Sequence, residues 1–182
     1  HTFPIKDFKR LHDGNTGPNT GSMGCLFDSE GLSYVRPKHI KEAEDINERV
    51  IKLLNERDGG YKGFLYGSFI IDERGNLKVI EFNSRLGDPE GVLILNKMQT
   101  DFGLVCKHIA DEKLDELTIK YNRTSAICKY LVPVSYPTLK CDDFMFETKF
   151  LTNEQKSHIY YGAVKLKEEG IYDKMFGTSS RT

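Results

Sequence analysis

A pair of apolar runs joined by a polar turn constrains the fold of this chain more than any other feature of its sequence. Residues 62–71 and 77–83 are both apolar, and the residues between them read DERGN, which is a strong hairpin signal. Side chains along a strand alternate between its two faces. Alternation divides the second run into two sets, one for each face: Leu77, Val79, Glu81 and Asn83 on the first, and Lys78, Ile80 and Phe82 on the second.

The shared face of Glu81 and Asn83 predicts a cation site. Both side chains offer oxygen ligands, which suit a hard ion such as magnesium that binds through one or two protein groups and substrate phosphates. Arg85, two residues further on, could reach a phosphate or a carboxylate in the same cleft. The alternative is that Glu81 is a solvated strand-end residue and Arg85 an ordinary surface cation, since short motifs often match by chance.

A second polar stretch, DGNTGPNTGSMG at residues 13–24, is rich in glycine. It predicts a loop whose backbone amides can approach a ligand closely, and successive amides of this kind bind anions. The stretch is neither GxGxxG nor a Walker A sequence, because no Gly-Lys-Ser/Thr closes it. The alternative is a surface connection without a ligand.

Composition narrows the function classes. The chain has 182 residues, of which 38% are hydrophobic and 29% charged, with a net charge of -1, so it can bury a substantial core in one large or two small domains. The charge balance gives no support to nucleic-acid or membrane partners, and no apolar run is long enough for a membrane span. The cysteines form no CxxC pair, which argues against zinc or a disulfide scaffold and favours the reducing cytoplasm: Cys25, Cys106, Cys128 and Cys141.

The remaining pattern predicts an α+β fold class. Residues 37–57 carry apolar side chains at helical spacing, and residues 90–110 follow a similar pattern. The polar segment 111–122 is the expected boundary between two parts. Three predicted strands of a smaller β-rich unit follow it: residues 125–134, 144–150 and 157–165.

Two blocks of sequence, KDFKRLHDGNTGPNTGSMG at 6–24 and the segment 61–90, carry a resemblance to a known family. With a helix-rich spacer between them, the chain resembles the phosphoribosylamine–glycine ligases (glycinamide ribonucleotide synthetases), ATP-grasp enzymes of purine biosynthesis. The resemblance implies the C-terminal half of an ATP-grasp domain at 1–116 and a small β-rich C-terminal domain at 117–182. Family members are considerably longer, so we expect an N-terminal part of the same enzyme to be missing and the segment alone to be inactive.

The resemblance also implies an activity and a site. The activity is ATP-dependent ligation of glycine to 5-phosphoribosylamine through an acyl phosphate, in the cytoplasm, with ATP and magnesium or manganese as cofactors. Glu81 and Asn83 would hold the metal, Arg85 and Asp88 would be catalytic, and the stretches from Thr16 to Gly24 and from Arg85 to Glu90 would line the site. The substrate-binding residues implied are these: Lys9, Arg10, Thr16, Gly17, Pro18, Asn19, Thr20, Gly21, Gly87 and Pro89. For Lys9, Arg10 and Asp88 the competing account is a structural ion pair.

The chain departs from the family pattern without losing a metal ligand. The differing positions are Phe8, Ser22, Ser84 and Leu86 in the two blocks, and, where the family has glycine-containing segments, Val134–Pro137 and Ser179–Arg181. Lost glycines restrict the approach of backbone to ligand. They keep open the alternative of a non-catalytic binding or structural module derived from an ATP-grasp enzyme. An ATP-grasp ligase for another acid and amine is a further alternative, because the parts that select phosphoribosylamine are expected to lie partly outside this chain.

Overall fold

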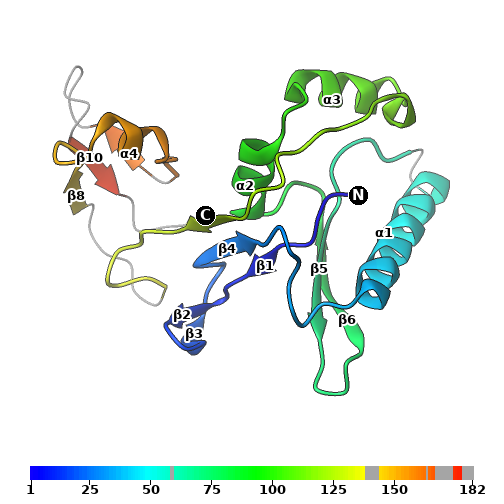
Figure 1. Ribbon diagram of the computed structural model, residues 1–182, viewed down its shortest axis with the longest axis horizontal. Helices are drawn as coiled ribbons and strands as arrows, with labels where there is room; N and C mark the ends of the chain where they lie inside the picture. Colours follow the sequence, from blue (N-terminus) through cyan, green and yellow to red (C-terminus); the bar gives the residue numbers. More distant parts are fainter. Residues whose placement is uncertain (58–59, 138–143, 163, 167–173, 178–182) are drawn as a thin grey trace. The chain divides into compact units, whose positions relative to one another are not determined.

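The computed structural model describes residues 1–57, 60–137, 144–162, 164–166 and 174–177 (Figure 1). They form two compact units, each of which is described by itself. The first comprises His1–Lys9 and Ser22–Lys129, and the second comprises Arg10–Gly21 and Tyr130–Thr182. Both contain strands and helices, in agreement with the predicted α+β class.

A three-stranded antiparallel sheet holds the core of the first unit. Its order is β1 (Lys6–Asp7), β4 (Gly24–Phe27) and β7 (Ala126–Lys129). Helix α2 (Glu90–Lys97) packs on β4 and β7 and contributes Leu93 to a buried cluster with Cys25 and Phe27. Burying apolar side chains between a sheet face and a helix is the main source of stability for such a unit.

Gly24 shows why a glycine begins β4. Its φ is +148°, and a Cβ built there would collide with the backbone carbonyl of Cys128 on the neighbouring strand. Only glycine avoids both penalties. The last glycine of the 13–24 stretch is thus explained by close packing of two strands.

The predicted hairpin is confirmed as β5 (Tyr66–Ile71) and β6 (Leu77–Asn83), although its first strand begins at residue 66 instead of 62. The Asp72 carboxylate holds the turn, because its Oδ1 accepts hydrogen bonds from the backbone N–H of Arg74 at 3.0 Å and of Asn76 at 2.8 Å. Aspartate commonly stabilises turns in this way.

A β-bulge interrupts the regular alternation of β6. Ser68 pairs with Glu81, but the next residue, Phe69, pairs with Val79, so Ile80 is an extra residue without a partner. A bulge of this kind shifts the faces of a strand by one residue. Cross-strand partners share a face, so Glu81 and Val79 point to opposite sides.

The bulge corrects part of the predicted face assignment. Leu77 and Val79 do not share the face of Glu81, and Lys78, paired with Ile70, does. Glu81 and Asn83 both follow the bulge, so their predicted common face is retained. The apolar face of the hairpin includes Phe69 and Phe82, whose rings meet edge to face with centroids 6.4 Å apart, as well as Gly67, Ile71, Leu77 and Val79.

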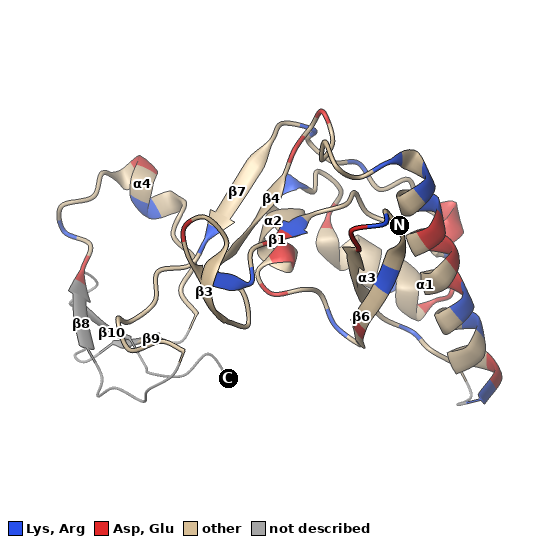
Figure 2. Cartoon of the chain, turned by 90° about the horizontal axis from the view of Figure 1, so that it is seen from below, with Lys and Arg blue, Asp and Glu red and all other residues tan. Residues whose placement is uncertain are grey.

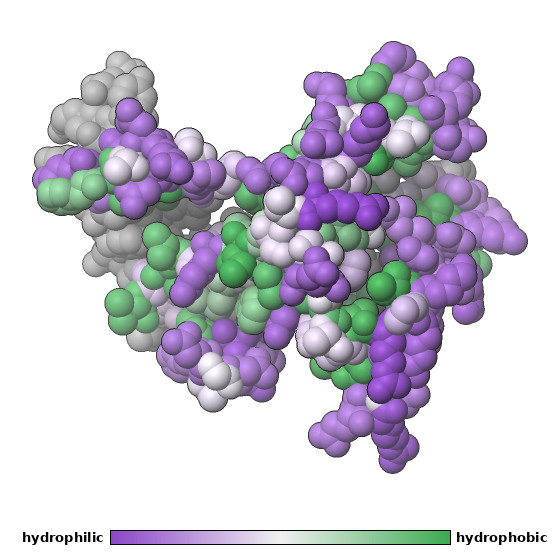
Figure 3. Space-filling view, in the orientation of Figure 1, coloured by the Kyte–Doolittle hydropathy of each residue, from purple (hydrophilic) through white to green (hydrophobic). Residues whose placement is uncertain are grey.

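Helix α1 (Pro37–Arg57) confirms the helix predicted over residues 37–57 and runs alongside the β5–β6 hairpin (Figure 1). Gly67 leaves room for this packing, because a Cβ at that position would collide with Oδ1 of Asn47. Lysine, arginine and acidic side chains are interspersed along α1 (Figure 2), and its outer side is hydrophilic (Figure 3). The helix is therefore amphipathic and stabilised by packing on the hairpin.

The single helix predicted over residues 90–110 is wrong, because two helices occupy this range. Helix α2 ends at Lys97, and α3 (Phe102–Ala110) begins after Asp101, whose Oδ1 accepts a hydrogen bond from the Leu104 N–H at 2.8 Å. Between the helices Met98 forms a β-bridge with Tyr121. The long-range bridge and the helix cap together break a pattern that looks continuous in sequence. A short 3₁₀ turn, η1 (Leu114–Glu116), follows α3.

The second unit contains a hairpin, a small sheet and a short helix. The hairpin joins β2 (Arg10–His12) to β3 (Thr16–Asn19), and the sheet has the order β8 (Phe144–Glu147), β10 (Lys174–Gly177) and β9 (Val164–Leu166). Helix α4 (Asn153–Ser157) begins with a capping box in which Thr152 and Gln155 bond each other's backbone.

The strands predicted after residue 122 are only partly correct. The range 125–134 yields β7, which pairs with β4 and belongs to the first unit. The range 144–150 yields β8, whereas 157–165 contains the end of α4 and only the start of β9. Cys141 and Ser179–Arg181 lie outside the described residues. In the described part of the chain, no helix is both long and apolar enough to cross a bilayer.

Candidate functional site

The predicted metal ligands lie on the polar face of the β5–β6 hairpin. Glu81 is paired across the sheet with Ser68, and Asn83 with Tyr66. Glu81 is exposed and Asn83 is partly buried. The two side chains stand one residue apart on one face, which is the spacing that lets both approach one ligand.

The chemistry of this pair fits a hard divalent cation. Within the described residues, no cluster of three or more His, Cys, Asp or Glu could hold a metal. A cation at Glu81 and Asn83 would therefore complete its shell with water and phosphate oxygens, as magnesium does. The Asn83 Nδ2 atom is buried and has no hydrogen-bond partner among the described residues. Nδ2 is a hydrogen-bond donor, so only the Oδ1 atom of Asn83 could bind a cation.

The turn after β6 combines buried and exposed residues. Gly87 and Pro89 are buried, whereas Arg85 and Asp88 are exposed. The Arg85 guanidinium donates a hydrogen bond to the Leu86 carbonyl at 2.9 Å, so it folds back onto its own turn. The turn thus presents one cation and one anion to solvent beside the end of β6.

The backbone of the same turn starts helix α2. The Gly91 N–H bonds the Gly87 carbonyl at 2.8 Å, and the Val92 N–H bonds the Pro89 carbonyl at 3.0 Å. Movement of the helix start would therefore move Asp88 as well.

Glu90 is the buried acid of the site. It is only 4% exposed, and its Oε1 accepts a hydrogen bond from the Tyr66 hydroxyl at 3.1 Å. Burial raises the pKa of Glu90 above its ordinary value, and the nearby charge of Asp7 raises it further. Burial also raises the pKa of the Tyr66 phenol, with a further contribution from Glu90. Tyr66 is therefore a neutral hydrogen-bond donor at physiological pH.

Asp7 and Lys9 form an ion pair at the edge of this site. Lys9 Nζ lies 2.7 Å from Asp7 Oδ2, and the Asp7 side chain is 14% exposed. This geometry is what the structural account of Lys9 requires, and its substrate-binding role stays a prediction. Burial raises the pKa of Cys25 to about 12, with Glu90 as a further cause, which keeps this thiol protonated and unreactive.

The glycine-rich stretch forms a hairpin instead of the predicted loop. Thr16, Gly17, Pro18 and Asn19 make up β3, and the Arg10 guanidinium bonds the Gly17 carbonyl at 2.8 Å within the same hairpin. Thr20 and Gly21 follow, and the Gly21 N–H bonds the Tyr136 hydroxyl at 3.3 Å. This hairpin belongs to the second unit, whereas Glu81 and Asn83 belong to the first. That the glycine-rich stretch and these two residues share one site stays a prediction.

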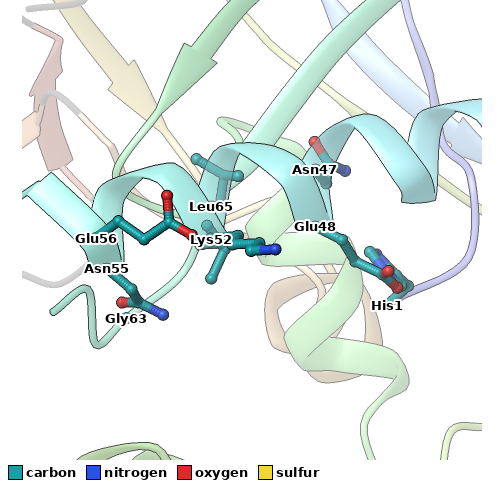
Figure 4. A pocket seen from close by; sticks show the side chains of 9 residues that line it. His1, Asn47, Glu48, Lys52, Asn55, Glu56, Gly63 and Leu65 are labelled. Atoms are coloured by element: carbon teal, nitrogen blue, oxygen red, sulfur yellow. The ribbon is translucent and has the colours of Figure 1, made fainter.

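A separate hollow of about 610 Å³ lies along α1, and neither Glu81 nor Asn83 lines it (Figure 4). Its lining is mixed polar and apolar: His1, Asn47, Glu48, Ile51, Lys52, Asn55, Glu56, Gly63 and Leu65. His1 and Glu48 approach each other to 3.1 Å at its rim. None of the predicted site residues lines it.

Sequence reasoning did not single out Tyr66, and it placed Glu90 only within a stretch implied to line the site. An acid in the first turn of a helix is usually solvated and favoured by the helix dipole. Nothing in the local sequence distinguishes a buried acid from that common case. A tyrosine opposite a predicted ligand across a hairpin could have signalled the contact.

The hairpin that carries Glu81 and Asn83, and the turn after it, lie in a domain of the ATP-grasp class. Residues 1–91, which are half of the chain and include β6 and the turn after it, match the phosphoribosylglycinamide synthetase ATP-grasp (A) domain. The chain therefore belongs to this family, as the resemblance predicted.

The chain is similar to curated proteins named phosphoribosylamine–glycine ligase. It is 37% identical to that of Methanosarcina acetivorans over 93% of this chain and 38% of the relative, and 37% identical to that of Methanocella arvoryzae over 98% and 40%. The chain thus spans about two fifths of the length of these relatives.

A solved structure agrees in fold. The crystal structure of phosphoribosylamine–glycine ligase from Thermotoga maritima matches with a TM-score of 0.62 and 23% identity, over 96% of this chain and 40% of that one. At this identity the similarity supports the fold.

Proposed function

We propose that the protein containing this chain ligates glycine to 5-phosphoribosylamine, with ATP converted to ADP and phosphate. The observation that carries the proposal is that the matched family domain ends just beyond a polar hairpin face bearing Glu81 and Asn83. The similarity to ligases of that name over nearly the whole chain supports the choice of substrates. The free cysteines support a reducing cytoplasmic location: Cys25, Cys106 and Cys128.

The reaction needs activation because a carboxylate is a poor electrophile. A carboxylate oxygen of glycine attacks the γ-phosphorus of ATP and ADP leaves. The amine of phosphoribosylamine then attacks the carbonyl carbon, phosphate leaves, and the nitrogen loses a proton. Positioning and charge stabilisation supply most of the catalysis in such transfers.

The residues of the first unit divide this work. Glu81 and Asn83 would hold magnesium or manganese, which offsets phosphate charge when bound. Arg85 would leave the Leu86 carbonyl to steady a phosphate or the carboxylate of glycine. Asp88 would accept a hydrogen bond from a substrate amino group.

Backbone N–H groups of the 16–21 stretch would also donate hydrogen bonds to substrates. Thr16 to Gly21, Gly87 and Pro89 would contact substrates, and Arg10 and Lys9 would add positive charge near them. The remainder of the enzyme would enclose the adenine of ATP, so the segment by itself should lack activity. We further propose that the stretches 1–116 and 117–182 are parts of two domains of that enzyme.

The test is ADP release by the full-length protein that contains this chain. Release that requires both glycine and phosphoribosylamine is expected, and each is omitted in turn. Release only with another acid or amine would indicate a ligase of different specificity, and release without any acid would indicate hydrolysis of ATP by water. Absence of both nucleotide binding and ADP release would indicate a non-catalytic module.

Replacement of one acid on the hairpin tests the metal assignment. Glu81→Ala should abolish turnover without unfolding the protein, whereas Glu73→Ala, at the exposed turn of the same hairpin, should retain it. Mn²⁺ binding with ATP, followed by electron paramagnetic resonance, should be weakened only in the first variant. Full activity of Glu81→Ala would remove its assigned role.

A further inference from the structure

The Tyr66 hydroxyl links the hairpin that carries Glu81 and Asn83 to the turn that carries Asp88. Tyr66 is the cross-strand partner of Asn83 on β5 and donates its hydrogen bond to Glu90 in the first turn of α2. Because Glu90 is 4% exposed, water cannot replace this donor. One hydroxyl therefore connects two elements that are 24 residues apart in sequence.

Gly87 is clamped between the two partners of this hydrogen bond. A Cβ built on Gly87 would lie 2.5 Å from Glu90 Oε2 and 2.7 Å from Cε2 of the Tyr66 ring. The carboxylate thus contacts the turn with one oxygen and receives the Tyr66 hydrogen bond with the other. Glu90 cannot rotate away from Gly87 without losing that bond.

We propose that Tyr66 is a positioning residue, which acts through Glu90 to hold the Gly87–Pro89 turn and thereby Asp88 and Arg85. This inference rests on the proposed function for the roles of Asp88 and Arg85, but the mechanical link is a property of the described residues alone. Loss of the hydroxyl removes the hydrogen bond that ties the Glu90 carboxylate to the hairpin. The turn then samples positions in which Asp88 and Arg85 no longer meet the reacting groups together.

The direct variant is Tyr66→Phe, which keeps the ring against Gly87 and removes the hydroxyl together with its hydrogen bonds to Glu90 and Ser68. In the full-length protein, kcat should fall about tenfold or more, since small misplacements of reacting groups have effects of this size. The KM for glycine should stay within about threefold, because the contacts themselves are retained once the turn is in place.

Tyr61→Phe is the matched control. Tyr61 is also partly buried in the first unit, and its hydroxyl donates a 2.7 Å hydrogen bond to the Phe64 carbonyl, away from the turn. This variant should lose stability to a similar extent and keep the wild-type kcat. An equal loss of kcat in both variants would show that the effect is general destabilisation, and would overturn the proposal.

The route through Glu90 is tested by a double variant. If Tyr66 acts through Glu90, Tyr66→Phe combined with Glu90→Gln should have the kcat of the worse single variant. If the fold-losses of kcat in the two single variants multiply in the double variant, Tyr66 acts independently of Glu90, and this result would overturn the proposal.

Hydrogen exchange separates this inference from the proposed function. In Tyr66→Phe, but not in Tyr61→Phe, exchange in a peptide covering residues 84–93 should accelerate at least about fivefold, because the Gly91 N–H is bonded to the turn at Gly87. This readout needs no substrate. A wild-type protein inactive on glycine would refute the proposed function alone, whereas unchanged exchange in Tyr66→Phe would refute the positioning role alone.

Discussion

Gly87→Ala is the perturbation whose outcome the structure defines most sharply. The added methyl group would lie 2.5 Å from Glu90 Oε2, 2.7 Å from Tyr66 Cε2 and 2.9 Å from Tyr66 Cδ2. All three distances are shorter than real Cβ contacts allow, so the neighbours must move. Gly87 has no positive φ, and the substitution is therefore opposed by packing and not by backbone conformation.

The neighbours of Gly87 cannot move without a cost. Glu90 is buried and Tyr66 is held by the hairpin, so neither can turn into solvent. Overpacking of this kind costs about 1–3 kcal/mol. Separation of the Tyr66 hydroxyl from the buried carboxylate adds about 1–3 kcal/mol. Alanine also lowers the conformational entropy of the unfolded chain, which stabilises the folded state by about 0.4–1 kcal/mol. At the middle of these three ranges, the expected net loss of stability is about 3 kcal/mol.

Thermal unfolding of the full-length protein measures this loss. At about 2–4 °C per kcal/mol for a unit of this size, Tm should fall by roughly 5–15 °C. Gly162→Ala is the control, because a Cβ there meets nothing within 4 Å and its φ is not left-handed. A Tm for Gly87→Ala within about 1 °C of the control would refute the clamped arrangement of Gly87, Tyr66 and Glu90.

Two further predictions concern local signals in the first unit. Asp101→Ala removes the side chain that caps α3 and should destabilise the protein by about 0.5–2 kcal/mol in urea unfolding, with the exposed Asp115→Ala near zero. The pKa of Asp72 lies below its usual range because the Asn76 N–H and Arg74 N–H bond its carboxylate. Its contribution to stability is therefore present above the unfolded pKa of about 4 and disappears as the pH falls through the lower folded value. Asp72→Asn should make unfolding less sensitive to pH in this acid range, and an unaltered pH profile would contradict the role of the carboxylate.

The local sequence was a good guide where a short segment decides its own structure. DERGN places an aspartate where its carboxylate can bond two turn amides, and the hairpin forms there. The 37–57 segment has both helical spacing and a proline at its first position, and it forms α1 over that range. Glycine-rich residues 13–24 misled for the opposite reason, since glycines that suggest a loop also fit the tight turn and close strand packing of a hairpin.

The errors occurred where a distant partner overrides the local pattern. The helical periodicity of residues 90–110 continues through Met98, but Met98 pairs with Tyr121 and ends the first helix. The alternation of β6 fails at Ile80, because the register with β5 includes an extra residue. The residues that pair with these two segments lie elsewhere in the chain. Neither the end of the first helix nor the bulge could therefore be predicted from the local sequence around it.

The sequence by itself determined the hairpin, the long helix and the presence of two side chains with oxygen atoms, Glu81 and Asn83, beyond the turn, because spacing and turn chemistry are local. The sequence also identified the family, because the family match over residues 1–91 includes both the glycine-rich stretch at 13–24 and the segment at 78–90. Only the tertiary structure decided which side chains share a face with Glu81, and that Glu90 is buried against Tyr66 and Gly87. Register and burial depend on contacts between residues far apart in the chain, and these contacts exist only after folding.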